Sequence, residues 1–319
     1  MTVEDKAIDS FRGCLIGLAI GDAIGTTAEF KARGTFEPVT DMVGGGPFDL
    51  EAGQWTDDTS MALCLAESLL ISNGFDADDL MQRFCMWSDE GYLSSTGECF
   101  DIGITVSEAL SRFTISGNPF SGSSDPLSAG NGSIMRLAPV PMYYYKDLKK
   151  TIEIAVLSSK TTHGTEECLE ACDLFSCMLN STFIGKAKEE ILKTGYSRSY
   201  KKEKIKEIAQ GSYLEKSIAD IRGTGYVVES LEAALWCFEK SDSFESAILS
   251  AVNLGDDADT TAAVCGQLAG AYYGYKGMPS HWKEQLCMHD KILGICDELF
   301  NASRIQLVSA TGGLISKNS

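Results

Sequence analysis

Small and apolar residues recur at helical spacing in three segments of the chain. Within residues 11–25, glycine occupies every fourth position, so a helix there would present one bare face to a closely packed neighbour. Residues 58–72 repeat large apolar side chains before an Asn-Gly stop signal, and residues 261–273 again mix small and apolar residues. The glycines of the first segment are Gly13, Gly17, Gly21 and Gly25. These patterns predict helices that pack closely together.

The composition extends this prediction to the whole chain. Of its 319 residues, 44% are hydrophobic and 23% charged, and there are only 7 Pro against 31 Gly. That balance is typical of a globular protein and favours packed helices over a strand-rich sandwich. Because no Pro- or Ser-rich linker and no fixed-period repeat divides the sequence, we expect one all-α domain over residues 1–319.

The charge of the chain excludes two classes of partner. The 27 Lys+Arg and 45 Asp+Glu residues give a net charge of −18, which opposes contact with a phosphate backbone, so we expect no nucleic-acid binding. The first residues include Glu4, Asp5 and Asp9 where a secretory leader would be basic, and Asp22 interrupts the following apolar run before membrane-spanning length. We therefore expect a cytoplasmic protein that binds no membrane.

Two further features of the composition favour structural roles. The number of cysteines is odd, 11, and most stand among apolar neighbours, which favours reduced core thiols over disulfides. Cys168, Cys172 and Cys177 lack the fourth ligand and tighter spacing of a zinc cluster. The charged stretch 186–216 predicts a solvated helix pair, with a partner-docking surface as the alternative.

The first acidic cluster, Thr56-Asp57-Asp58, stands directly before an apolar helix. Asp and Thr are good N-caps, so capping explains one of these side chains. It explains two adjacent carboxylates less well, because the compensation from the helix dipole is typically below about 1 kcal/mol at exposed sites. The second carboxylate therefore needs a cation or hydrogen-bond donors.

The second acidic cluster, residues 256–261, again opens a helix of small residues and contains Asp257, Asp259 and Thr260. Carboxylates and hydroxyls are hard oxygen ligands that suit Mg²⁺, Mn²⁺ or Ca²⁺ and suit zinc poorly. Neither cluster has the twelve-residue loop of an EF-hand. If the fold brings the two helix entrances together, they would form a site for two divalent ions about 3.5–4 Å apart.

Two more carboxylates are candidates for acid–base chemistry. Glu29 follows the glycine-rich segment among small residues, where it is either a surface charge or a general base that positions water. Asp101 precedes a predicted helix that ends near Phe113, and its alternative role is to cap that helix.

A loop of small residues, Gly130-Asn131-Gly132-Ser133, leads into another predicted helix. Such a turn exposes backbone N–H groups that suit phosphate, although the Walker lysine is missing. His163 lies in a loop at a helix entrance and is one of three histidines. A lone histidine is more often a structural hydrogen-bonding group, and we find no Ser-His-Asp arrangement.

Seven segments in chain order resemble motifs of the ADP-ribosylglycohydrolase family, in particular its bacterial branch typified by the dinitrogenase-reductase-activating glycohydrolase. They are GCLIGLAIGDAIG, QWTDDTSMAL, LSSTGECFDIG, GNGSIMRLAPV, TTHG, GTGYVVESLEAALW and NLGDDADTTAA. The double acidic motif is the most specific of them. The resemblance implies a compact orthogonal helical bundle whose cleft holds two Mg²⁺ or Mn²⁺ ions against the ribose hydroxyls of ADP-ribose.

The resemblance also implies residue roles. One metal half would consist of Thr56, Asp57 and Asp58, and the other of Asp257, Asp259 and Thr260. Asp58 and Asp259 would hold the ions at the catalytic centre, and Asp101 or Glu29 would orient water or shuttle a proton. The Asn131-Gly132-Ser133 turn and His163 would hold the diphosphate and distal ribose, with Tyr226 packed on the nucleotide. Asp256 stands where many family members have Gly.

The function implied by the resemblance is hydrolysis of the N-glycosidic bond between ADP-ribose and arginine on a modified protein. One alternative is a hydrolase of serine-linked or O-linked ADP-ribose. A different class is an immunity protein that binds and blocks an ADP-ribosyltransferase toxin. We expect a monomer whose partner is the ADP-ribosylated protein.

Overall fold

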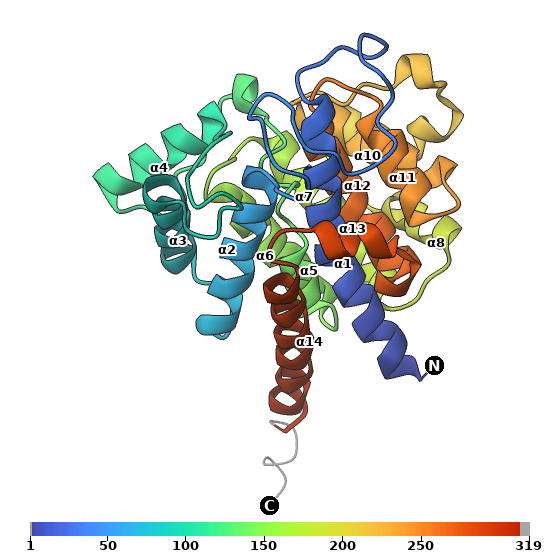
Figure 1. Cartoon of the computed structure of the whole chain (residues 1–319). Coiled ribbons are helices and arrows are strands. Elements are labelled where there is room, and N and C mark those ends of the chain that lie inside the picture. Colours follow the sequence, from blue (N-terminus) through green and yellow to red (C-terminus); the bar gives the residue numbers. More distant parts are fainter. Residues whose placement is uncertain (1, 313–319) are drawn as a thin grey trace, which may run out of the picture.

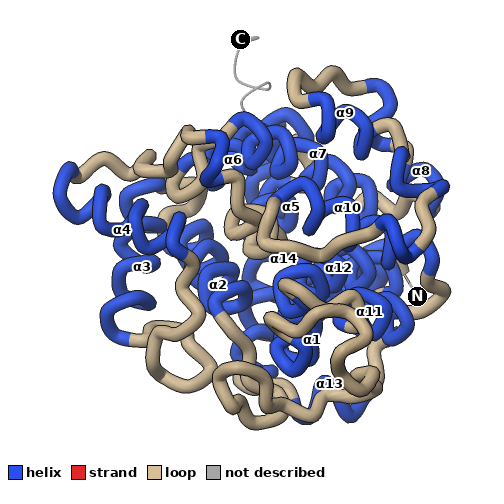
Figure 2. The backbone as a smooth tube through the Cα atoms, turned by 90° about the horizontal axis from the view of Figure 1, so that it is seen from above, coloured by secondary structure: helices blue, strands red, loops and turns tan. Residues whose placement is uncertain are grey.

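The computed structural model describes residues 2–312, which form helices joined by loops (Figures 1 and 2). Within these residues the only β pairing consists of three isolated bridges, Gly45–Leu50, Ser123–His163 and Gly130–Tyr226. The prediction of an all-α fold is therefore confirmed. The ends of the predicted domain 1–319, Met1 and residues 313–319, lie outside the described residues.

The helices follow one another along the chain with short 3₁₀ turns between some of them. The α-helices are α1 Val3–Gly25, α2 Asp57–Ile71, α3 Ala77–Glu90, α4 Ile104–Ser116, α5 Pro139–Tyr144, α6 Leu148–Lys160, α7 Glu166–Phe183, α8 Lys188–Leu192, α9 Glu203–Ala209, α10 Val227–Lys240, α11 Phe244–Val252, α12 Ala258–Tyr273, α13 Ser280–Gln285 and α14 His289–Gly312. The 3₁₀ turns are η1 Thr26–Ala28, η2 Pro126–Ser128, η3 Thr194–Ser197, η4 Ser212–Glu215, η5 Ile218–Asp220 and η6 Tyr275–Gly277.

The centre of the fold is the pair α1 and α12, which pack together more extensively than any other two elements (Figure 1). Their backbones touch. A Cβ atom built on Gly17 would lie 2.4 Å from the carbonyl oxygen of Gly266, and one built on Gly266 would lie 2.1 Å from that of Gly17. The predicted bare face of the first helix is confirmed, and it brings the end of α1 beside the start of α12.

We expect Gly17→Ala to lower the free energy of unfolding by about 1–3 kcal/mol, because the added methyl group meets a backbone carbonyl that cannot move aside. The matched control is Gly294→Ala in α14, where an added Cβ meets no atom within 4 Å. There alanine should stabilise the exposed helix by about 0.5–1 kcal/mol. Urea unfolding measures both changes, and equal effects of the two substitutions would contradict the close packing.

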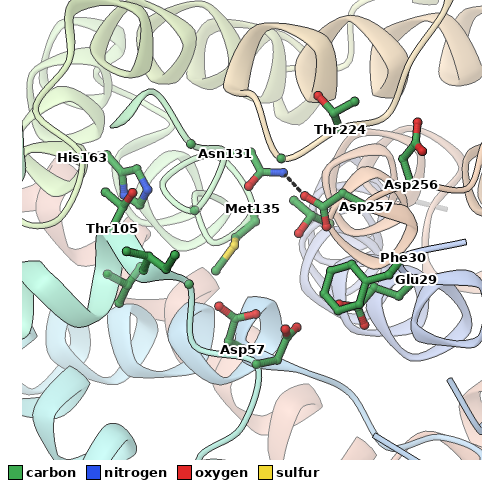
Figure 3. Close-up of a pocket in the computed structure, with 18 residues that line it drawn as sticks. Glu29, Phe30, Asp57, Thr105, Asn131, Met135, His163, Thr224, Asp256 and Asp257 are labelled. Carbon is green, nitrogen blue, oxygen red and sulfur yellow. Dashed lines mark hydrogen bonds between the residues drawn. The ribbon is translucent and has the colours of Figure 1, made fainter. Parts of the chain in front are cut away.

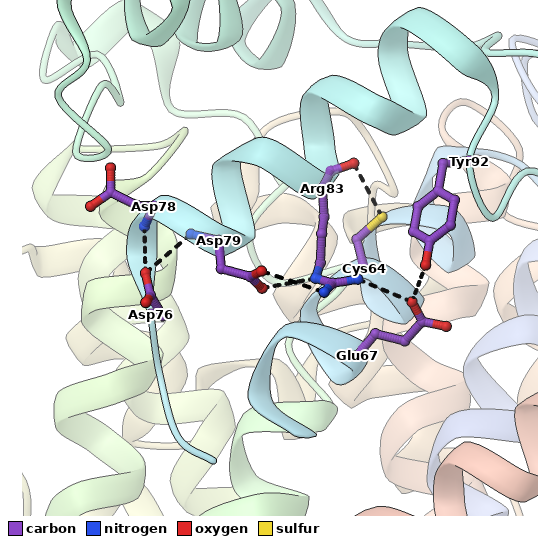
Figure 4. A network of polar contacts seen from close by, with 7 residues as sticks. All are labelled: Cys64, Glu67, Asp76, Asp78, Asp79, Arg83 and Tyr92. Atoms are coloured by element: carbon purple, nitrogen blue, oxygen red, sulfur yellow. Dashed lines mark hydrogen bonds and ion pairs between the residues drawn. The ribbon is translucent and has the colours of Figure 1, made fainter. Parts of the chain in front are cut away.

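A polar network joins α2 to α3 beside this core (Figure 4). Asp76 caps α3 by accepting hydrogen bonds from the N–H groups of Asp78 and Asp79. Arg83 pairs with Asp79 on its own helix and with Glu67 on α2, at 2.8 and 3.2 Å. The exposed carboxylate of Asp78 points away from the rest of the network (Figure 4).

The structure tests the remaining expectations from composition. All eleven cysteines are free thiols, and eight of them are buried, as expected for core residues. Cys168, Cys172 and Cys177 lie on α7. The charged stretch 186–216 contains the short helices α8 and α9, each with one ion pair between neighbouring turns. Within residues 2–312, every helix is too short or too polar to span a membrane.

Candidate active site and metal centre

A cleft of about 660 Å³ lies where the N-terminal ends of α2 and α12 meet (Figure 3). The segment after α1, the loop before α4, the turn at 130–132 and the loop before α10 complete its walls. The lining residues are Glu29, Phe30, Asp57, Asp101, Gly103, Ile104, Thr105, Val106, Gly130, Asn131, Gly132, Met135, His163, Thr224, Gly225, Asp256, Asp257 and Thr260. Most of the candidate residues from the sequence therefore meet in one place.

Asp22, near the end of α1, anchors the start of α2. One of its oxygens accepts hydrogen bonds from the backbone N–H and the hydroxyl of Thr56, both at 2.8 Å. The other accepts the corresponding bonds from Thr59, at 3.0 and 2.6 Å. This clamp explains why the Thr56 side chain makes no capping bond to α2 although Thr56 is the N-cap. From the sequence, Asp22 was noted only as the charge that interrupts the apolar run of the first helix, so this clamp was missed.

The two acidic motifs are joined by reciprocal hydrogen bonds between hydroxyls and carboxylates. The Thr56 hydroxyl lies 3.2 Å from Asp259, and the Thr260 hydroxyl donates to Asp58, also at 3.2 Å. The single hydroxyl hydrogen of Thr56 is shared between Asp259 and the nearer oxygen of Asp22, at 2.8 Å. The capping interpretation is wrong for both motifs, because neither helix start has a side-chain capping bond.

The loops around these motifs have unusual backbone conformations. Phe30, Asp101 and Asp256 have φ near +57°, in the left-handed region that non-glycine residues rarely adopt. Phe30 N–H donates to the Asp256 carbonyl, and Asp256 N–H donates to that of Lys31, so the two loops are tied together. Strained backbone of this kind is concentrated at functional sites. The tie places Glu29 next to the second acidic motif.

Asp101 does not cap α4. The N-cap of that helix is Gly103, which forms no side-chain capping bond. The left-handed backbone at Asp101 instead directs the chain so that its carboxylate lies in the cleft wall. The capping alternative for Asp101 is therefore wrong.

Two groups of carboxylates could hold a metal ion. Asp22, Asp58 and Asp259 form one, and Glu29, Asp101 and Asp259 form the other, with the oxygen atoms of each group within 4.8 Å of one another. Asp259 belongs to both groups, as a carboxylate shared by two neighbouring cations would. Asp57 and Asp257 lie outside both groups of carboxylates, although they and Thr260 line the same cleft.

Unpartnered oxygens show that this donor set suits a cation. Asp58 Oδ2 and Asp259 Oδ1 are buried without a hydrogen-bond partner in the described chain. Both oxygens of Asp22 already accept two hydrogen bonds, so Asp22 acts as a clamp more readily than as a ligand. A buried carboxylate oxygen without a partner is costly, and an all-oxygen set matches a hard divalent ion.

The electrostatics of the cleft agree with this interpretation. Burial and the neighbouring carboxylates raise the pKa of Asp57, Asp58 and Asp259 well above the usual range. Burial, followed by the charge of Asp101, raises the pKa of Glu29 to about 9, and burial, followed by the charge of Asp257, raises that of Asp101 to about 7. A bound cation would favour the charged form of these carboxyl groups and so oppose the raised pKa values.

We therefore expect Mg²⁺ to raise the unfolding temperature more at pH 8 than at pH 5.5. Carboxyl groups with raised pKa values bind more protons in the folded chain, so metal-free stability falls as pH rises between about 4 and 9. Cation binding releases those protons and tightens with pH. At 100 times its Kd, one ion adds about 2.7 kcal/mol. Thermal scans with Mg²⁺ and with EDTA measure the increment, and an increment as large at pH 5.5 would contradict it.

The turn at 130–133 lies across the cleft from Glu29 (Figure 3). The Asn131 side chain donates to Asp257 at 2.7 Å, and its backbone N–H donates to the carbonyl of Gly225. Residues 132–136 form turns, and the next helix, α5, begins only at Pro139, so the prediction that this loop opens a helix directly is wrong. The N–H groups of Gly132 and Ser133 find no acceptor within residues 2–312, which leaves them available to an anion.

His163 lines the cleft, whereas Tyr226 does not. His163 is buried in the cleft wall, and its Nδ1 lies 2.8 Å from the Thr162 hydroxyl. Tyr226 lies outside the lining residues, because its hydroxyl donates to Glu167 and Lys204 lies over its ring. Its neighbours Thr224 and Gly225 line the cleft instead. Packing of Tyr226 on the nucleotide stays a prediction.

Sequence reasoning missed the apolar side chains of the cleft. Phe30 and Ile104 line it although they are 69% and 80% exposed, and Met135 lies deeper between the two acidic motifs and the 130–133 turn (Figure 3). The adjacency of Phe30 to Glu29 and of Ile104 to the loop of Asp101 was the only signal available for them.

Comparisons with known proteins find relatives along almost the whole chain. A family model described as ADP-ribosylglycohydrolase matches residues 3–307. Two proteins named ADP-ribosylarginine hydrolase Tri1, from Pseudomonas putida and Serratia proteamaculans, are 44% and 41% identical over 297 residues, which cover 93% of this chain and 79% and 80% of theirs. A solved structure described as an ADP-ribosylglycohydrolase-related protein complex aligns with a TM-score of 0.85 and 38% identity, over 94% of this chain and 99% of that one.

Proposed function

Because the chain belongs to the ADP-ribosylglycohydrolase family, we propose that it hydrolyses the N-glycosidic bond between ADP-ribose and arginine on modified proteins. The observation that carries this proposal is the pair of carboxylate groups that share Asp259, of which Glu29 and Asp101 line the same cleft as the turn at 130–132. The names of the relatives that are 41–44% identical support arginine as the acceptor.

Two Mg²⁺ or Mn²⁺ ions fit the carboxylates better than softer metals do. Asp58 and Asp259 offer buried oxygens without hydrogen-bond partners, and Glu29 would add a third carboxylate, while Asp101 lies beside them. When bound, such ions would supply coordination sites for the vicinal hydroxyls of the ribose and compensate the negative charge of the cleft.

The remaining groups bind the substrate and move one proton. The N–H group of Gly132 in the cleft wall and that of the adjacent Ser133, with His163, would bind the diphosphate and the distal ribose. Asp101 would accept a proton from the attacking water while the water oxygen forms a bond to the anomeric carbon. The bond from that carbon to the guanidine nitrogen breaks, and the nitrogen takes up the proton. The products are ADP-ribose and unmodified arginine.

Two observations favour Asp101 over Glu29 as the group that accepts the proton from the attacking water. Glu29 is 2% exposed, and its single hydrogen bond, from Thr26, is 3.5 Å long, which suits a metal ligand. Asp101 is only partly buried, and its side chain lines the cleft. Water therefore has access to the residue that would take its proton.

The decisive experiment measures release of free ADP-ribose from an arginine-modified protein and from a serine-modified protein, each with Mg²⁺ and with EDTA. We expect metal-dependent release from arginine alone, lost in Asp58→Ala. The matched control is Asp78→Ala, which removes an exposed aspartate from the same second position of another helix. Release from serine alone would reassign the acceptor. No release from either substrate would favour a binding role, such as blocking an ADP-ribosyltransferase toxin.

A further inference from the structure

Arg136 is an arginine in the core without a carboxylate partner in the described chain. It is 1% exposed, and its guanidinium lies 4.8 Å from the centre of the Phe84 ring. Its N–H groups donate to the Gly132 carbonyl and the Thr162 hydroxyl at 2.6 Å, and more distantly to Met61 Sδ and the Ser158 carbonyl. Burying a charged guanidinium costs free energy because it loses its contacts with water, so its two short hydrogen bonds are expected to serve a purpose.

Both short bonds end at the wall of the cleft. Gly132 belongs to the anion-binding turn, and Thr162 precedes His163. A Cβ on Gly132 would lie 2.7 Å from His163 Cε1 and 3.1 Å from Nε2, so only a glycine there lets the imidazole lie against the turn. Arg136 therefore connects the turn at 130–133 to the loop of Thr162 and His163 from the core side of the cleft wall.

The directions of these hydrogen bonds fix the position of one proton. A guanidinium only donates, so the Thr162 hydroxyl oxygen accepts from Arg136. The hydroxyl has a single hydrogen, and the acceptor in reach is His163 Nδ1 at 2.8 Å. The opposite arrangement, with Nδ1 donating, would leave the hydroxyl hydrogen buried without an acceptor. Nδ1 is therefore unprotonated, and the neutral ring carries its hydrogen on Nε2.

The Nε2–H group lies beside the turn at 130–132, in the wall of the cleft. Nε2 makes no hydrogen bond within residues 2–312, and His163 forms part of the cleft wall (Figure 3). Burial, followed by the charge of Arg136, lowers the pKa of His163 to about 3, which keeps the ring neutral at physiological pH. A neutral ring with a fixed Nε2–H is a hydrogen-bond donor of constant direction.

We propose that Arg136 and Thr162 are positioning residues that hold His163 in its Nε2–H tautomer, so that this N–H donates to an oxygen acceptor of the substrate. The identity of that acceptor, a phosphate or ribose oxygen of ADP-ribose, rests on the proposed function. The tautomer itself does not.

The test uses ¹⁵N-histidine-labelled protein, in which only His163, His281 and His289 give ring signals. Long-range ¹H–¹⁵N spectra of the wild type should show Nδ1 of His163 unprotonated and hydrogen-bonded, and Nε2 protonated. In Thr162→Val, which keeps the side-chain shape, the Nδ1 signal should move to the position of a nitrogen without a hydrogen-bond donor. Thr162→Ser should restore it. Signals of His281 and His289 report on the fold of each variant.

Binding of free ADP-ribose provides the second readout. We expect Thr162→Val to weaken it about tenfold, as for one lost hydrogen bond to a charged group, while Thr162→Ser stays within about twofold of the wild type. The unfolding-temperature increment from Mg²⁺ should not change. Arg136→Met removes the first donor, and an unaltered Nδ1 signal in a folded Arg136→Met protein would overturn the role of Arg136.

A wild-type His163 with the hydrogen on Nδ1 would overturn the whole proposal, as would an unchanged Nδ1 signal in Thr162→Val. These outcomes are separate from failure of the proposed function. If the wild type releases no ADP-ribose but shows the expected ring signals, the tautomer assignment stands and the substrate assignment falls.

Discussion

Asp259→Asn is expected to lower kcat/KM for release of ADP-ribose from arginine by about 10³-fold or more. Asparagine keeps the size of the side chain and an oxygen that can lie against the Thr56 hydroxyl. It removes the negative charge that the two carboxylate groups share, and so weakens both cation positions together. Several kcal/mol of transition-state stabilisation are at stake in such a centre, and each 1.36 kcal/mol is tenfold in rate.

The matched control for this substitution is Asp78→Asn. Asp78 and Asp259 each follow an alanine as the second residue of a helix, but the Asp78 carboxylate is exposed on α3 and points away from its neighbours (Figure 4). We expect Asp78→Asn to keep wild-type activity and the Mg²⁺-dependent increase of unfolding temperature, while Asp259→Asn loses both. An Asp259→Asn enzyme within tenfold of the wild type would contradict a shared metal ligand.

The sequence predicts those parts of the site that lie close together along the chain. Two runs of adjacent carboxylates at helix entrances were sufficient to infer a cation site, because the repulsion between neighbouring negative charges has to be offset by a cation or by hydrogen-bond donors. The glycine spacing of α1 likewise predicted close packing of helices, which the contact of Gly17 with Gly266 confirms. Both inferences rest on local repetition.

Contacts between distant segments could not be predicted in this way. The clamp of Asp22 on Thr56 and Thr59 spans more than 30 residues, and the reciprocal bonds of Thr56 and Thr260 span about 200. Nothing in an isolated Gly-Asp pair distinguishes a clamp from a surface charge. Arg136 stands among apolar residues in the sequence. Its neighbours along the chain therefore do not reveal that its hydrogen-bond partners are a carbonyl and a hydroxyl.

The capping alternatives fail for one physical reason. For the acidic motifs and for Asp101, capping was the alternative to a metal or catalytic role, and it rested on residue type and spacing, which ignore backbone conformation. Asp101 has φ of +57°, and the N-cap of the helix after it is Gly103, so the first turn of that helix receives no side-chain capping bond. Helix-cap propensity describes the average loop, and strained loops at functional sites are exceptions to it.

Asp101→Asn and Glu29→Gln are expected to impair the enzyme in different ways. Loss of a general base typically lowers rates by 10²–10⁴-fold, so Asp101→Asn should reduce kcat by about that factor while the Mg²⁺-dependent increase of unfolding temperature remains. Glu29→Gln should reduce that increase as well as activity, because the Glu29 carboxylate is nearly inaccessible to water and receives only one long hydrogen bond. Comparing activity with metal-dependent stability therefore separates proton transfer from metal binding.

The loop of Asp101 contains its own control, the exposed residue Glu98. Glu98→Gln also removes one negative charge near the cleft, so any effect of overall charge on a cationic substrate would be visible in it. We expect Glu98→Gln to change kcat by less than about twofold. If Asp101→Asn abolishes the Mg²⁺ increment and Glu29→Gln keeps it, the two roles must be exchanged, and Glu29 becomes the residue that takes the proton from water.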